Sequence, residues 1–99
     1  MLELNGKRFD WDSNKNVINI NKHRVSFREA ATVFSDPNAI EIDDEKHSQQ
    51  EDRFLIIGRS SKLRLIVVCH CYRENDIIRI ISARKAVNEE IELYGGDET

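Results

Sequence analysis

The chain has 99 residues, of which 39% are hydrophobic and 33% charged, and its formal net charge at pH 7 is −3. This length predicts one domain, residues 1–99, and this composition is typical of a folded soluble protein rather than a disordered one. Because the longest apolar run has five residues and no apolar leader begins the chain, we expect no membrane span, no secretory signal and a cytoplasmic location.

The first strand is predicted near the N-terminus. Polar and aromatic residues alternate over residues 7–12, as in a short strand, whereas residues 1–5 are either loose or an edge strand. Trp11 is the only tryptophan and is open to two interpretations, which are packing in the core or stacking on a nucleic-acid base.

The segment that follows is ambiguous. Asp12 or Ser13 can cap a helix, but residues 15–24 fit either a broad apolar helical face or the alternation of a strand. Its basic side chains, including Lys15, Lys22 and His23, are expected at the surface on either interpretation.

A second helix is predicted with more specific signals. Ser26 and Glu29 match a capping box, in which the serine accepts from the Glu29 amide and the glutamate reaches back. An apolar stripe follows at helical spacing and ends before Pro37. The stripe consists of Phe27, Ala30, Ala31 and Phe34.

The second half of the chain is predicted to form a sheet and a last helix. Four strands are expected, at residues 39–43 and 53–59 and around the apolar runs 65–69 and 77–81, with Gly58 marking a bulge or a close backbone approach. Residues 87–94 fit a short helix that Gly95 ends. The predicted fold class is α+β, with an antiparallel sheet of about four strands, two N-terminal helices and a short C-terminal helix.

The pairing of the two long strands decides which side chains share a face. A two- or four-residue turn after Tyr72 would place His70 opposite Arg79 or one diagonal step away. Similar turns would bring Arg53, Arg59 and Arg64 to that face, and the drier opposite face, with Cys69 and Cys71, would then receive the helices. The cysteines stand two apart on one strand, about 6.5 Å, too far for a disulfide with each other.

Charge is unevenly distributed along the chain. Residues 59–85 hold seven basic and two acidic residues, whereas residues 36–52 hold seven acidic and one basic. A basic face on the sheet could bind an anion despite the negative total. The alternative interpretation is that these arginines pair with the acidic segments.

The residue types exclude several chemistries and leave one. The four glycines are scattered and form no phosphate-binding loop, and we expect no metal site or cofactor, because Cys69 and His70 point to opposite faces. RNA carries its own nucleophile, the 2′-hydroxyl. A metal-free site therefore needs only to position this hydroxyl, to take and give a proton, and to stabilise the phosphate. The candidate catalytic residues are His70, as general acid or base, with Arg79, Arg64 and Arg59. The candidate RNA-binding residues are Trp11, Lys15, Lys22, His23, Arg84 and Tyr94.

The sequence resembles the BrnT family, the toxin half of a bacterial type II toxin–antitoxin pair. The residues that carry the resemblance include Phe9-Asp10-Trp11-Asp12, Asn19, Lys22-His23, Val25-Ser26-Phe27, Arg53-Phe54, Gly58-Arg59-Ser60, His70, residues 79–86, Glu90 and Tyr94. The resemblance implies a RelE-like fold and a ribonuclease that halts translation. It also implies a cognate BrnA-like antitoxin with a ribbon-helix-helix part, through which the complex would bind operator DNA.

One departure from the family pattern supports an alternative hypothesis. The last helix is acidic, with Glu89, Glu90 and Glu92, where the resemblance implies a basic one. The alternative is therefore a non-catalytic, degenerate toxin that acts as antitoxin partner and co-repressor.

Overall fold

The computed structural model describes residues 1–48 and 51–95 of the chain. The elements in these ranges are β1 (Leu2–Leu4), β2 (Lys7–Asp10), α1 (Ser13–His23), α2 (Phe27–Thr32), the 3₁₀ turn η1 (Val33–Ser35), β3 (Ile40–Asp43), the 3₁₀ turn η2 (Glu45–His47), β4 (Phe54–Arg59), β5 (Leu65–Arg73), the 3₁₀ turn η3 (Glu74–Asp76), β6 (Ile77–Lys85) and α3 (Asn88–Tyr94). No helix in these ranges is long and apolar enough to cross a membrane.

The sheet contains six strands in the order β1-β2-β6-β5-β4-β3. The four predicted strands are present, but the expectation of an antiparallel sheet of about four is wrong, because β1 and β2 add a hairpin at one edge. The β2 strand pairs parallel to β6, with Phe9 beside Ile78. Pairing between residues about 70 positions apart leaves no local pattern, which is why the sequence did not predict it.

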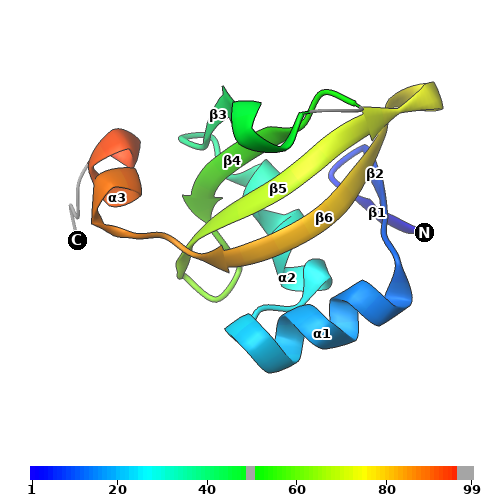
Figure 1. Ribbon diagram of the computed structural model, residues 1–99, viewed down its shortest axis with the longest axis horizontal. Helices are drawn as coiled ribbons and strands as arrows, with labels where there is room; N and C mark the ends of the chain where they lie inside the picture. The colour runs from blue at the N-terminus through cyan, green and yellow to red at the C-terminus, as the bar shows by residue number, and fades with distance from the viewer. Residues whose placement is uncertain (49–50, 96–99) are drawn as a thin grey trace.

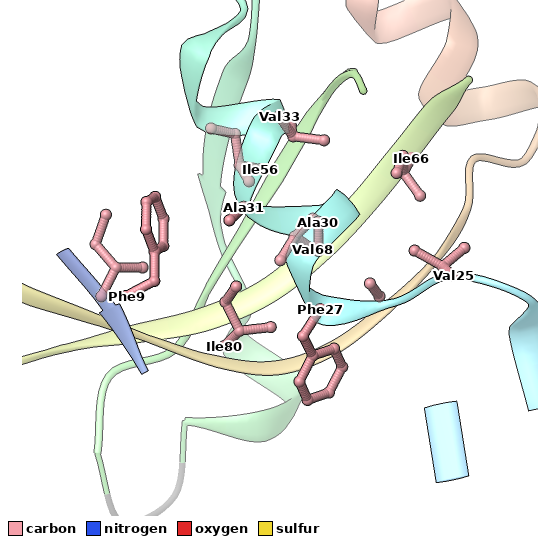
Figure 2. Packing of buried hydrophobic residues seen from close by; sticks show 12 residues of the cluster. Phe9, Val25, Phe27, Ala30, Ala31, Val33, Ile56, Ile66, Val68 and Ile80 are labelled. Atoms are coloured by element: carbon pink, nitrogen blue, oxygen red, sulfur yellow. The ribbon is translucent and has the colours of Figure 1, made fainter. Parts of the chain in front are cut away.

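Two helices cover one face of this sheet. In Figure 1, α2 lies behind the strands and α1 runs along the side of β6. Figure 2 shows Phe27 and Ala30 of α2 among Val68 of β5 and Ile80 of β6, and all four side chains are buried. The ambiguous segment is therefore helical, and Asp12 is its N-cap, accepting from the Asn14 amide at 2.8 Å.

On β5 the helices cover the opposite face from the one predicted. The connection between β5 and β6 is the three-residue turn η3, in which Asn75 has a left-handed φ of 66°, and the register shifts between Cys69 and His70. Consequently His70 faces Ile80, whereas Arg79 faces Cys71 across the strands. The predicted His70–Arg79 pair is wrong because a three-residue turn, rather than one of two or four residues, changes which residues share a face.

The capping box of α2 is only half formed. Ser26 accepts from the Glu29 amide at 3.0 Å, as predicted. The Glu29 carboxylate does not reach back, but accepts from the Ser60 hydroxyl at 2.6 Å and from the Arg64 guanidinium. Glu29 thus joins α2 to the β4–β5 connection.

Two glycines have the roles that the sequence suggested. At Gly58 an added Cβ would lie 2.8 Å from Val33 Cγ1 and 3.0 Å from Ala39 Cβ, so η1 can approach β4 closely only because no side chain intervenes. Gly95 ends α3 with a φ of 118°.

Candidate functional site

The predicted catalytic histidine lies inside the protein. His70 is fully buried on the helix-covered face, with its ring centroid 4.8 Å from that of Phe34 and 5.4 Å from that of Tyr72. Burial lowers the pKa of the imidazole, and the nearest carboxylate, on Glu41, is 3.7 Å from Nε2. A polymer such as RNA cannot reach this ring without opening the core.

Two of the three predicted catalytic arginines pair with a carboxylate of the chain. Arg64 pairs with Glu29, and the Arg79 guanidinium lies 3.3 Å from the Asp10 carboxylate. Burial alone would raise the pKa of Glu29, but hydrogen bonds from Arg64 and Ser60 outweigh it and hold the pKa below its ordinary value.

The fourth predicted residue, Arg59, is part of a different contact. Its backbone N–H donates to Asp36 Oδ2 at 2.8 Å, and its guanidinium lies 5.8 Å from the centre of the Tyr94 ring. The Tyr94 hydroxyl donates to the same Asp36 oxygen at 2.6 Å and joins α3 to the sheet.

The four predicted catalytic residues therefore do not form one site. No hydrogen bond or ion pair joins any two of them in the described ranges, and His70 and Arg79 lie on opposite faces of the sheet. The expectation that His70 and Arg64 share one sheet face with the other arginines is wrong, although Arg59 and Arg79 do lie on a common face, beside Leu65 and Cys71. The alternative interpretation, that these arginines neutralise the chain's own carboxylates, describes Arg64 and Arg79.

A different group of polar side chains converges on the sheet face that α1 and α2 leave open. There a cavity of about 390 Å³ lies between η2 and the strands β4, β5 and β6. Its lining residues are Asp44, Lys46, His47, Arg53, Leu55, Cys69, Ile81, Ser82 and Arg84. We call it the open-face cavity. Three permanent cations line it against one carboxylate, which suits an anionic ligand.

A histidine–carboxylate pair lies at the edge of this cavity. His47 Nδ1 is 3.1 and 3.0 Å from the two Asp44 carboxylate oxygens, in a turn that the His47 N–H closes by donating to the Asp44 carbonyl at 3.2 Å. The Asp44 side chain is 9% exposed and that of His47 is 62% exposed. A fixed carboxylate with an accessible imidazole is an arrangement that can orient a proton-transfer group.

The two arginines of the cavity differ in their partners. Both guanidinium nitrogens of Arg84 donate to the Glu90 carboxylate at 2.8 Å, and these hydrogen bonds lower the pKa of Glu90. Arg53 Nε is buried and has no hydrogen-bond acceptor within the described residues, and its nearest carboxylate oxygen, on Glu51, is 3.9 Å away. Arg53 thus has a donor left for a ligand.

The cysteine in the cavity is not poised for reaction. Burial, together with the nearby charge of Asp44, raises the pKa of the Cys69 thiol to about 11, so the thiol stays protonated at neutral pH. In residues 1–48 and 51–95, no three His, Cys, Asp or Glu side chains come together as a metal site.

The predicted RNA-binding residues are dispersed. Arg84 lines the open-face cavity, whereas Lys15, Lys22 and His23 lie on α1. Trp11 is half-buried and packs edge-on against Phe27, with ring centroids 6.1 Å apart, so packing is its main contact.

The sequence-based interpretation missed the His47–Asp44 pair. Residues 44–52 are all polar, so the sequence alone fits a loop with a solvent-exposed histidine. The available signal was the three-residue spacing, which puts Asp44 and His47 side by side in a single turn of 3₁₀ helix. Arg53 was instead expected on the same face as His70.

Comparisons with known proteins agree with this fold. The crystal structure at 1.1 Å resolution of the Brucella abortus ribonuclease toxin, BrnT, matches with a TM-score of 0.63 and 24% sequence identity, over 83% of this chain and 99% of that chain. A comparison with curated proteins gives no match. A family model described as "Ribonuclease toxin, BrnT, of type II toxin-antitoxin system" matches residues 11–90.

The family match defines the class of the protein, which is a toxin of the type II toxin–antitoxin class. Within that class, the chain belongs to the BrnT ribonuclease toxin family, as the sequence resemblance predicted. Membership implies a cognate antitoxin as partner.

Proposed function

We propose that the protein is a metal-independent endoribonuclease that cleaves RNA in the open-face cavity. The observation that carries this proposal is the His47–Asp44 pair at the edge of a cavity lined by Lys46, Arg53 and Arg84. Family membership supports RNA as the substrate.

In the proposed reaction the RNA supplies its own nucleophile. Neutral His47 takes the proton of a ribose 2′-hydroxyl through Nε2, while the Asp44 carboxylate accepts the Nδ1 hydrogen and fixes the tautomer. The 2′-oxygen forms a bond to phosphorus, and the bond to the 5′-oxygen breaks. The leaving oxygen takes a proton from water at the cavity mouth, which gives a 2′,3′-cyclic phosphate and a 5′-hydroxyl end.

The cations of the cavity act on the phosphate. The unpaired Nε of Arg53 can donate to a non-bridging oxygen, and Lys46 adds a mobile positive charge. Arg84 can contribute once its guanidinium turns from Glu90 toward the phosphate. These roles replace those that the sequence suggested for His70, Arg64 and Arg59.

The test is cleavage of a synthetic RNA by the purified protein, with and without EDTA. His47→Gln should lower the rate about 10²- to 10⁴-fold, as for loss of a general base. A 2′-O-methyl RNA should resist cleavage because its nucleophile is blocked, and EDTA should leave the cleavage rate unchanged. Asn21→Gln, at an exposed position of α1, is the control and should retain full activity.

The same assay decides between the two sets of candidate residues. Under this proposal Arg79→Ala cleaves RNA normally, because Arg79 pairs with Asp10 and is not among the cavity residues. Loss of cleavage in Arg79→Ala with normal activity in His47→Gln would contradict the proposal. A protein that leaves RNA intact yet binds its antitoxin would instead support the non-catalytic co-repressor hypothesis.

The proposed cellular role follows from the cleavage. In the cytoplasm the enzyme would inhibit translation by cutting RNA, and a BrnA-like ribbon-helix-helix antitoxin would neutralise it and bring the complex to operator DNA. Expression without antitoxin should arrest growth, and His47→Gln should relieve the arrest.

A further inference from the structure

The outer surface of α1 has two properties that are unusual together in this chain. It exposes aliphatic side chains, with Val17 57%, Ile18 61% and Ile20 37% accessible. The helix and the five residues that follow it also carry only basic charge, because residues 13–28 contain four Lys or Arg and no Asp or Glu, in a chain whose total charge is −3. The four cations are Lys15, Lys22, Arg24 and Arg28, and all are exposed.

These cations differ from the arginines of the sheet in having no carboxylate partner. None of the four takes part in an ion pair within the described residues, whereas Arg64, Arg79 and Arg84 all do. Lys15 and Lys22 lie one turn before and one turn after Ile18, so positive charge flanks the exposed aliphatic surface along the helix. An acidic segment would complement it.

The same helix is held rigidly from its inner side. Asn19 is buried and hydrogen-bonds to Ala83 of β6, and Asn16 Oδ1 accepts from the Phe27 amide at 2.9 Å. The exposed surface is therefore preorganised, which lowers the entropy cost of binding a partner.

We infer that the outer surface of α1 is the docking surface for an acidic, amphipathic segment of the cognate antitoxin. The aliphatic character of Val17 and Ile18 favours a protein over RNA, because bases stack on aromatic or guanidinium planes and branched aliphatic side chains offer none. An amphipathic helix would place its apolar side on Ile18 and its carboxylates beside Lys15 and Lys22.

This surface lies at the edge of β6, on the other side of the sheet from the open-face cavity. Ala83 of β6 binds α1 through Asn19, and its neighbours Ser82 and Arg84 line the cavity. A segment anchored on α1 can thus continue past β6 toward the cavity mouth. The inference relies on the antitoxin partner that family membership implies, and not on cleavage in the cavity.

The test measures binding between the full-length protein and the purified product of the adjacent reading frame, by isothermal titration calorimetry. Ile18→Asp and Lys22→Glu should each weaken the affinity at least about tenfold, and binding should weaken with added salt. Ile42→Asp is the matched control, because Ile42 is also an exposed aliphatic residue but lies on β3. It should bind normally.

RNA cleavage by one of these variants separates this inference from the proposed function. Ile18→Asp should cleave RNA as the unchanged protein does. Normal antitoxin affinity in both Ile18→Asp and Lys22→Glu, or no complex at all, would overturn the inference. Lost RNA binding with intact antitoxin binding would overturn it as well and assign α1 to RNA. If His47→Gln is inactive and Ile18→Asp binds the antitoxin more weakly, the results support both the proposed function and this inference.

Discussion

The Asn19 side chain completes the hydrogen bonding of the β6 backbone at Ala83. Its Nδ2 donates to the Ala83 carbonyl at 2.9 Å, and its Oδ1 accepts from the Ala83 N–H at 3.1 Å. The β2 strand pairs with β6 only over Ile77–Arg79, so the backbone edge beyond Arg79 needs another partner. The Asn19 amide takes the hydrogen-bonding place of a neighbouring strand there. Its third hydrogen bond, donated to the Val25 carbonyl at 2.8 Å, fixes the connection between α1 and α2.

We expect Asn19→Ala to lower the free energy of unfolding by about 2 to 4 kcal/mol, because three buried backbone groups lose their partner. Urea denaturation followed by circular dichroism measures the change. Asn21→Ala, at an exposed position of the same helix, is the control and should change the value by less than about 0.5 kcal/mol. Equal effects of the two substitutions would contradict the strand-like role of Asn19.

Arg64 is expected to act on stability rather than on catalysis. Its guanidinium binds the Glu29 carboxylate, whose side chain is 2% exposed, and also donates to the Arg24 carbonyl at 2.9 Å. Since Arg64 itself is 28% exposed, we expect Arg64→Ala to cost about 2 to 3 kcal/mol, below the range for a fully buried pair.

The control for Arg64 is Lys62→Ala, because Lys62 lies 4.0 Å from the same carboxylate and is 69% exposed. It should change stability by less than about 0.5 kcal/mol. RNA cleavage per folded molecule should be unchanged in Arg64→Ala. A hundredfold loss of cleavage in Arg64→Ala with unchanged stability would show instead that Arg64 acts in catalysis.

The contrast between these residues shows how far the sequence could predict the structure. The helix start at Ser26, the four later strands and the helix end at Gly95 follow from local patterns, and these predictions were confirmed. The segment after Asp12 fitted a helix or a strand, and only the structure decided between them. The register between β5 and β6 depends on one residue of turn length. This single uncertainty exchanged the two faces of β5 relative to the prediction and separated His70 from Arg79. The carboxylate that each arginine binds is set by tertiary packing, so charge counts along the chain could not assign it.

The buried His70 should make stability decline as the pH falls below about 7. Burial holds the pKa of the folded imidazole below its ordinary value of 6.5, so in this range the unfolded chain binds a proton that the folded protein does not. Stability should therefore be full above about pH 7 and decline as the pH falls through about 6.5. Glu29, Asp36 and Glu90, whose pKa values lie below their ordinary 4.5, 3.8 and 4.5, contribute only at lower pH.

Urea midpoints measured from pH 8 to pH 5 test this dependence. His70→Gln should flatten the decline, whatever its overall stability, because the substituted side chain does not titrate. Asn21→Gln, which removes no titrating group, should keep the slope of the unchanged protein. If His70→Gln keeps the full slope, another group carries the dependence.

The bidentate pair between Arg84 and Glu90 should limit how strongly the open-face cavity binds RNA. The Glu90 carboxylate accepts two hydrogen bonds from the same guanidinium that lines the cavity, so a phosphate must compete with it. We expect Glu90→Gln to tighten binding of a short RNA about 3- to 5-fold, the worth of a partly exposed charge contact. Fluorescence anisotropy at two salt concentrations measures the affinity. Glu89→Gln changes the net charge equally on an exposed position of the same helix and should have a smaller effect. Weaker binding in Glu90→Gln would mean instead that Glu90 holds Arg84 in the orientation that RNA requires.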